Sequence, residues 1–374
     1  MKNYFLFVFL AFLLSCSNTE DDCSNCTKII IDLNNKSNNL FSSIIDEIHF
    51  TPLEQNDSCL IRQIDKIDIV NDNIYILDRS SSSIFVFNKL GDFLWKVSEQ
   101  GRGPQEYYGI GDCAVNPLNE NIYVLDPISK GVKVFNKHGF LKNIKADHIQ
   151  ARISGIHFLD SQRIALLNKF SSESKQWKYQ LLITDENLNV ISKQIPYNTR
   201  CDMVLSPIAP FSRTTSGISY LPVYENVIFN IDKDNSAIPK YIMDFGRQSI
   251  DKDYMLSKEL NPMNLFKKLA DSGQIYQINY VESVGHLLFY FKYKKDNYLY
   301  CYNKQKNSGV LVDDLTENFC GFNELPIYTK YNYFVGVTGK NIRKIIQNKI
   351  TSQLVIKNNG RHQSEFSLMY IKLK

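Results

Sequence analysis

Short runs of hydrophobic residues alternate with polar turns along most of this chain, and two stretches repeat the same pattern. Asn71–Tyr107 reads NDNIYILDRSSSSIFVFNKLGDFLWKVSEQGRGPQEY, and Asn119–Leu141 reads NENIYVLDPISKGVKVFNKHGFL. When the two stretches are superposed, Asp78 matches Asp126 at an offset of 48 residues (126 − 78 = 48). A fixed period of about 40–50 residues built from short strands is typical of the blades of a β-propeller.

Each copy of the repeat contains hydrophobic runs that favour strands. The runs Asn73–Leu77 and Ser83–Asn88 are rich in Ile, Tyr, Phe and Val, which suit a pleated, half-buried surface. A polar DRSSSS turn separates them, and Gly91 can adopt the positive φ that lets the chain reverse into Phe93–Val97. Each unit is therefore predicted to be a meander of antiparallel strands, whose two faces would be buried by neighbouring sheets around an axis.

Weaker copies of the unit follow and set the number of blades. Strand-like runs recur within Arg163–Thr184, Tyr220–Gly246, Ile275–Asn303 and Tyr331–Lys374, which gives six units with the two clear copies. Dividing the 347 residues after residue 27 (374 − 27 = 347) by the period gives about seven instead. We therefore predict an all-β fold, a six-bladed β-propeller, with seven blades as the alternative.

Two parts of the chain depart from the plain repeat. Asn261–Gly273 reads NPMNLFKKLADSG; its Asn-Pro start and final glycine predict a short helical insertion near 261–273. Before the first repeat, Lys28–Leu33 and Glu47–Leu53 are strand-like. We expect one of these two runs to pair with the C-terminal strands, because that pairing closes the ring and removes two sheet edges.

The N-terminus has the features of an export signal. Met1–Cys16 reads MKNYFLFVFLAFLLSC, in which Lys2 precedes an apolar run that is too short to span a membrane. Leu13–Cys16 resembles a bacterial lipobox, so Cys16 is the predicted site of lipidation, with an ordinary signal peptide as the alternative. We expect the lipid chains to anchor the protein to the outer membrane of the cell envelope by hydrocarbon burial.

Three segments follow from this interpretation: a lipoprotein signal peptide at 1–15, a flexible tether at 16–27 and a β-propeller domain at 28–374. Glu20–Asp22 in the tether resembles an acidic signal for surface exposure, with a solvated linker as the alternative. Cys23 and Cys26 form a CxxC, but neither the helix N-terminus nor the second CxxC that a redox or zinc site needs is present. A disulfide between them stays open.

Composition and motifs narrow the classes of partner. The chain has 43 Lys and Arg against 39 Asp and Glu, and a formal net charge of +4 is too weak to indicate nucleic acid. The six histidines are scattered, and no HExxH, GxSxG or P-loop motif occurs. We therefore predict no cofactor, no metal and a monomeric propeller that reaches the membrane through its lipid.

The loop Gly101–Tyr107, GRGPQEY, is the first candidate site. Arg102 offers a planar fork that suits a carboxylate, a phosphate or a sugar, with Glu106 as its partner. Tyr107 and Tyr108 add aromatic faces that can stack on sugars. These four residues are the candidate ligand-binding site; the alternative is an inter-blade loop held by an Arg102–Glu106 contact or by a backbone clamp.

Asp78 and Asp126 are the second candidate, as channel or turn carboxylates. In some propeller enzymes, carboxylates from several blades converge on a central metal, because a divalent ion needs several hard ligands. Only two clear copies occur in this chain, and Asp followed by Ser or Pro near a strand end is also a common turn cap. No metal site is predicted from them.

Several motifs together carry a family resemblance. Asn71–Gly91 resembles the repeats of NHL-type propellers. The whole chain resembles the six-bladed β-propeller lipoproteins of Gram-negative gut anaerobes, through the lipobox, FTPLE at Phe50–Glu54, GRGPQEY, YIMDFG at Tyr241–Gly246 and the closing YIKLK; RHQSEFSLMY departs from that family's pattern. The resemblance implies a propeller fold and an envelope location, and no particular function.

Two functional hypotheses remain. The first is a binding or scaffold protein that presents one face to a glycan, a peptide or another envelope protein, since no catalytic motif stands out. The alternative is a metal-dependent enzyme of the lyase or lactonase type, with a divalent metal on the axis. Carboxylates or histidines that point into the central channel from at least three blades would favour the enzyme.

Overall fold

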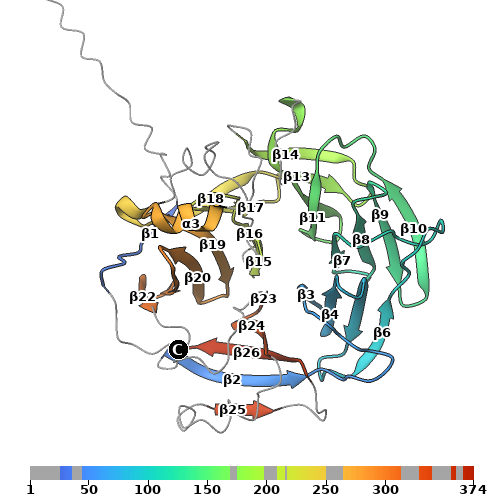
Figure 1. Ribbon diagram of the computed structural model, residues 1–374, viewed down its shortest axis with the longest axis horizontal. Helices are drawn as coiled ribbons and strands as arrows, with labels where there is room; N and C mark the ends of the chain where they lie inside the picture. The colour runs from blue at the N-terminus through green and yellow to red at the C-terminus, as the bar shows by residue number, and fades with distance from the viewer. Residues whose placement is uncertain are drawn as a thin grey trace, which may run out of the picture.

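Six β-sheets form a ring around a central axis in the computed structural model of this chain (Figure 1). The structure describes residues 26–35, 44–168, 175–197, 209–214, 217–249, 264–312, 328–338, 355–358 and 365–374. The predicted all-β propeller is confirmed, with six blades rather than seven. Cys16, Cys23 and the acidic run 20–22 lie outside the described residues.

Each blade is a meander of mostly antiparallel strands that run in order from the axis outward. Blade 1 contains β3 (Lys66–Val70), β4 (Asn73–Asp78), β5 (Ser83–Phe87) and β6 (Phe93–Val97). Blade 2 contains β7 (Asp112–Val115), β8 (Ile122–Asp126), β9 (Gly131–Asn136) and β10 (Gly139–Lys145). Blade 3 contains β11 (Ile153–Phe158), β12 (Arg163–Asn168), β13 (Tyr179–Asp185) and β14 (Val190–Pro196). Blade 4 contains β15 (Phe211–Thr214), β16 (Gly217–Tyr220), β17 (Val227–Ile231), β18 (Ala237–Asp244) and β1 (Thr27–Ile30). Blade 5 contains β19 (Ile275–Glu282), β20 (His286–Tyr293), β21 (Asp296–Asn303) and β22 (Ser308–Val312). Blade 6 contains β23 (Tyr328–Lys330), β24 (Tyr333–Thr338), β26 (Ser367–Leu373), β2 (Ile45–Pro52) and β25 (Val355–Asn358). The helical elements are η1 (Lys175–Trp177), η2 (Gly246–Gln248) and α3 (Leu265–Asp271).

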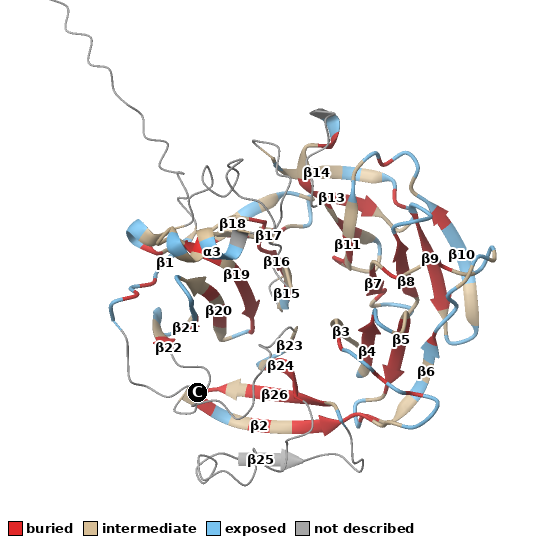
Figure 2. Ribbon diagram, viewed as in Figure 1, coloured by how far each residue is buried: buried red, intermediate tan, exposed pale blue. Residues whose placement is uncertain are grey.

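Hydrophobic side chains of the middle strands fill the spaces between neighbouring blades. Every residue of β5 is buried, whereas the first four residues of β6 at the rim alternate between partly buried and exposed (Figure 2). Between blades 1 and 2, one buried cluster joins Tyr75 and Val86 to Val124 and Phe135. Full burial of a side chain of this kind contributes about 1.5–3 kcal/mol, so each blade is stabilised by covering the next.

The ring is closed by strands from the two ends of the chain. β2 pairs antiparallel with β26, with Phe50 opposite Met369, and also pairs parallel with β25. The expectation that one early strand-like run pairs with the C-terminal strands is thus confirmed for the run at Glu47–Leu53. The earlier run behaves differently, because β1 joins the outer edge of blade 4 in parallel with β18.

The predicted helical insertion is observed as α3, which comes directly before blade 5. Gly273 has a φ of +71°, the left-handed conformation expected of a glycine that ends a helix. The predicted start at Asn261 and Pro262 lies outside the described residues. No helix in the described ranges has the length and the apolar character needed to span a membrane.

Candidate axial binding site

The innermost strands of all six blades line one cavity on the axis. Its volume is about 630 Å³, within the range typical of ligand pockets. We call it the axial cavity. Its lining includes one or more residues from each inner strand: Lys66 of β3, Asp112 of β7, His157 of β11, Phe211 of β15, Gln277 of β19 and Tyr328 of β23.

Blades 1 and 2 supply a charged side of the axial cavity that is already paired. The ammonium of Lys66 lies 3.0 and 3.1 Å from the two carboxylate oxygens of Asp112 and donates to the carbonyls of Cys113 and Ile156 at 2.6 and 3.0 Å. Arg79 forms an ion pair with Asp65 at 3.3 Å. A single ammonium therefore joins the inner strands of three successive blades.

The charge of Lys66 is maintained by this environment. Burial acts to lower the pKa of Lys66, but Asp112, Cys113 and Asp68 together outweigh burial and hold the pKa above its ordinary value. Asp68, on the same strand, shows the opposite balance, because burial raises its pKa and attraction to Lys66 and Arg213 only partly offsets the rise. The cavity therefore contains a permanent cation at this side.

The feature that would favour the enzyme hypothesis, carboxylates or histidines in the channel from at least three blades, is partly present. Asp68, Asp112 and His157 line the cavity from three different blades. However, Lys66 occupies the position from which a metal ion would contact Asp112 and the two carbonyls. Within the described part of the chain, no three His, Cys, Asp or Glu side chains are grouped so that they could hold a metal ion.

Blades 3, 4 and 5 form a different side of the axial cavity, which we call the amide side. It contains three amide side chains, from Asn168, Gln180 and Gln277, together with His157 and Phe211. Three buried polar atoms on this side have no hydrogen-bond partner among the described residues: His157 Nε2, Asn168 Oδ1 and Gln277 Oε1. Leaving such an atom unpartnered costs about 1–3 kcal/mol, so these atoms need an explanation.

The hydrogen bonds of Asn168 fix which of its atoms is unpartnered. Its side chain is 2% exposed, and Nδ2 donates to the carbonyls of Trp177 at 2.9 Å and Tyr179 at 3.0 Å. Because only the NH₂ group can donate to two carbonyls, the free atom is the carbonyl oxygen Oδ1. Asn168 thus contributes a hydrogen-bond acceptor to the amide side.

Gln277 is held by an unusual backbone. It lies where the register of β19 against β20 shifts between Tyr276 and Asn279, and its φ is +55°. A left-handed conformation is strained for a residue with a Cβ, and a bulge of this kind redirects a side chain. The inner strand therefore presents Gln277 to the cavity at a conformational cost.

His157 is a neutral member of the amide side. Its ring stacks on Phe211, with centroids 4.7 Å apart and planes 8° from parallel. Burial lowers the pKa of His157 well below 6.5, and repulsion from Arg213 and Lys66 adds to this effect. At neutral pH the imidazole is therefore uncharged.

The Gly101–Tyr107 loop lies apart from the axial cavity. Glu106 accepts a hydrogen bond from the backbone N–H of Gly103 at 2.7 Å. A Cβ on Gly101 would lie 1.9 Å from the Glu106 carboxylate, so glycine leaves room for that group. Glu106 thus clamps the backbone of the loop, and Arg102 is exposed beside it.

The two tyrosines of that candidate site differ from each other. Tyr107 is fully buried, donates to the carbonyl of Ser82 at 2.7 Å and packs edge-on against Phe135. Tyr108 is 45% exposed. Neither tyrosine lines the axial cavity, so the structure does not bring the loop residues together with the amide side.

Asp78 and Asp126 also lie outside the cavity lining. Both are fully buried and accept hydrogen bonds from neighbouring backbone N–H groups. Their carboxylates act as turn caps, which was the alternative to a role in the channel. Sequence reasoning missed the cavity residues, although Lys66 and Asp112 open the inner strands of adjacent repeats with opposite charges.

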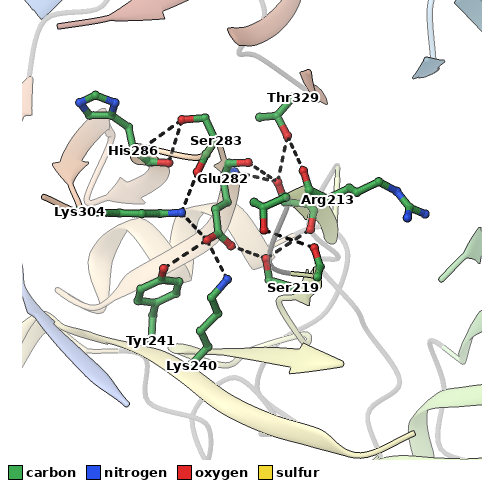
Figure 3. A network of polar contacts seen from close by, with 12 residues as sticks. Arg213, Ser219, Lys240, Tyr241, Glu282, Ser283, His286, Lys304 and Thr329 are labelled. Carbon is green, nitrogen blue, oxygen red and sulfur yellow. Dashed lines mark hydrogen bonds and ion pairs between the residues drawn. The ribbon is translucent and has the colours of Figure 1, made fainter. Parts of the chain in front are cut away.

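A second polar cluster joins blades 4 and 5 (Figure 3). Glu282, at the end of β19, is fully buried and accepts hydrogen bonds from Lys240 at 2.8 Å, from Tyr241 at 3.2 Å, and from Lys304 and Ser219. Figure 3 shows that the guanidinium of Arg213 points away from this carboxylate. This cluster is internally paired and connects the two blades.

A family of proteins shares this chain's sequence pattern. The model of a domain of unknown function, DUF4934, matches residues 28–364. The chain belongs to the DUF4934 family. No curated protein is detectably similar to this DUF4934 chain in sequence.

Solved structures share the fold of this DUF4934 chain. A Bacteroides fragilis protein named "putative exported protein" has a TM-score of 0.77 at 19% identity, covering 93% of this chain and all of that one. A DUF4221-family member from Bacteroides vulgatus has a TM-score of 0.52 at 11% identity, covering 88% and 97%. Virginiamycin B lyase from Staphylococcus aureus reaches only 0.42 at 10% identity, covering 88% and 99%, which is too distant for an argument.

Proposed function

We propose that this protein is an exported binding protein of the cell envelope and that its ligand occupies the axial cavity. The observation that carries the proposal is the set of unpartnered atoms on the amide side: His157 Nε2, Asn168 Oδ1 and Gln277 Oε1. A ligand that bonds to these atoms would form hydrogen bonds that no described protein group makes. Preorganised polar groups in a pocket of this size are typical of a binding site.

The proposed location rests on the N-terminus and on one structural neighbour. The lipobox at Leu13–Cys16 supports a lipid anchor at Cys16, and the acidic run after it supports exposure at the cell surface. The similarity to a "putative exported protein" fits an envelope or extracellular location. In cells, Cys16→Ser is expected to abolish incorporation of labelled palmitate; continued labelling would contradict the anchor.

The binding proposal is tested on the native lipoprotein extracted in detergent. It is dialysed against the low-molecular-mass solutes of the spent growth medium, and retained solutes are identified by mass spectrometry. We expect retention by the wild type and its loss in His157→Phe, which preserves a ring on Phe211 but removes Nε2. Arg102→Ala is the matched control outside the cavity; loss in that variant alone would place the ligand at the Gly101–Tyr107 loop instead.

A further inference from the structure

The unpartnered atoms of the amide side restrict the chemistry of the ligand. Asn168 Oδ1 is a fixed acceptor, because both hydrogens of its NH₂ group are used by carbonyls. Gln277 Oε1 is a second acceptor without a partner. A ligand that completes this side must therefore donate hydrogen bonds, which an ionised carboxylate or a phosphate dianion does not do.

The charges around the cavity disfavour the other common donor, an ammonium group. Lys66 and Arg213 are close enough to His157 to lower its pKa, so a cationic ligand beside that ring would meet the same repulsion. The carboxylates of Asp112 and Asp65 are already paired with Lys66 and Arg79, and burial raises the pKa of Asp68, the third carboxyl group in the lining. A ligand cation would find little uncommitted negative charge on this side.

The remaining groups suit a molecule whose polar groups both donate and accept. Lys292 lines the cavity on β20, opposite Tyr276 and next to Gln277, and its ammonium lies 5.8 Å from the centre of the Phe266 ring, so blade 5 also supplies a donor. The rings of His157, Phe211 and Tyr220 adjoin one another, with centroid distances of 4.7 Å from Phe211 to His157 and 4.9 Å from Phe211 to Tyr220, and together they give the side an aromatic wall. A sugar ring carries hydroxyls, which both donate and accept hydrogen bonds, and C–H faces, which pack on such a wall.

From these observations we propose that the ligand is an uncharged, polyhydroxylated molecule, a neutral saccharide, bound by the amide side. This inference rests on the proposed binding function. Asn168 and Gln277 accept hydrogen bonds from ring hydroxyls, and Lys292 donates to a further hydroxyl. The strained backbone of Gln277 holds the second acceptor in place before the ligand arrives.

The test uses four pools of solutes of similar size. A partial hydrolysate of mixed polysaccharides is separated by ion exchange into neutral, acidic and basic saccharides, and a protease digest of casein supplies peptides. The native lipoprotein in detergent is dialysed against each pool, and retained species are titrated individually. We expect at least one neutral saccharide to be retained and no species from the other three pools.

Two variants show whether the amide side is responsible. Gln277→Gly accepts the positive φ and removes the side chain, so it is expected to fold and to bind the retained saccharide about tenfold more weakly, as for one lost hydrogen bond. Arg102→Ala is expected to bind as the wild type does. An unchanged affinity in Gln277→Gly would overturn the assignment.

Other outcomes of the dialysis test distinguish a wrong ligand class from a wrong binding function. Retention of only acidic or basic saccharides, or of peptides, with loss in Gln277→Gly, would overturn the ligand class while the cavity remained a binding site. Failure of the wild type to retain any species from the four pools or from spent medium would overturn the binding function and this inference with it.

Discussion

Asp78 and Asp126 make equivalent hydrogen bonds in two successive blades. One carboxylate oxygen of Asp78 accepts the backbone N–H of Arg62 at 2.8 Å, and one of Asp126 accepts that of Tyr108 at 3.0 Å. Each donor stands four residues before the inner strand of its blade (66 − 62 = 4; 112 − 108 = 4). The second oxygen caps the turn after the strand, at Ser81 and at Ser129. The repeated aspartate therefore fixes where each inner strand begins.

The first prediction concerns these two caps. Asp78→Ala and Asp126→Ala each leave buried backbone N–H groups without an acceptor, so each is expected to lower the free energy of unfolding by about 2–3 kcal/mol. The control Asp46→Ala removes a 47% exposed carboxylate and should lower the free energy of unfolding far less. Urea unfolding measures all three, and equal losses would contradict the capping role.

The second prediction concerns the ammonium that joins blades 1, 2 and 3. Lys66→Met removes the nearer cation from the largely buried carboxylate of Asp112, which keeps only Arg79 at 3.9 Å, and is expected to destabilise the protein by about 3 kcal/mol. The double variant Lys66→Met, Asp112→Asn removes both charges and should recover part of that loss. Thermal unfolding of the two variants gives the comparison. A double variant less stable than the single one would show that the charge of Asp112 is not the cause.

The third prediction separates binding from stability at Gln277. Since glycine adopts φ of +55° without strain, Gln277→Gly should be as stable as the wild type or more stable by up to about 1 kcal/mol. Tyr331→Gly is the matched control, because Tyr331 has the same φ in an exposed turn outside the cavity lining. Measured by urea unfolding, both variants should be at least as stable as the wild type. A clear loss in Gln277→Gly alone would mean that its side chain supports the fold.

The fourth prediction is a pH dependence. The pKa of His157 is well below 6.5 in the folded protein, so the unfolded chain binds a proton that the folded chain does not, and stability falls as the pH drops below about 6.5. His157→Phe removes this titration, and its free energy of unfolding should change less between about pH 6.5 and pH 5. His138→Gln, at an exposed position, should follow the wild-type profile. A His157→Phe profile parallel to the wild type would contradict the buried neutral imidazole.

The fifth prediction concerns the joint between blades 4 and 5. Burial acts to raise the pKa of Glu282, but Lys240 and Lys304 outweigh it and lower the pKa below 4.5. Its stabilising contribution is therefore complete above about pH 4.5 and is lost as the pH falls through the lowered pKa. Glu282→Gln should lower the free energy of unfolding by about 3–5 kcal/mol at pH 7. In urea unfolding, the free energy of this variant should also fall less than that of the wild type as the pH drops below about 4.5. Adding Lys304→Met should restore part of the stability.

The sequence allowed the fold to be predicted because the repeat is local. The match of Asp78 with Asp126 marks a strand, a turn and a strand within one blade, and each of these forms between residues close in the chain. Even the closing strand was predictable, since an early strand-like run needs a partner to cover its edge. Blade 4 was harder, because β1 reaches it from the far N-terminus.

The axial cavity was not predictable in the same way. His157, Asn168 and Gln277 lie on different strands of blades 3 and 5, and no spacing in the sequence relates them. The bulge at Gln277 arises from the pairing of β19 with β20, which the residue type alone does not indicate. The GRGPQEY loop is prominent in the sequence because of its two glycines. These glycines make room for the Glu106 carboxylate, so they serve the packing of the loop.

The pairing of β2 with β26 also sets the timing of folding. Phe50 lies opposite Met369, 319 residues later (369 − 50 = 319), so the first strand of the ring stays unpaired until the end of the chain has been delivered. Blades built from local meanders can form while the chain is still being synthesised, whereas the last blade cannot. The ring therefore remains an open arc with an exposed edge until β26 is available, and the blade behind the sixth wall of the axial cavity is the last to be completed.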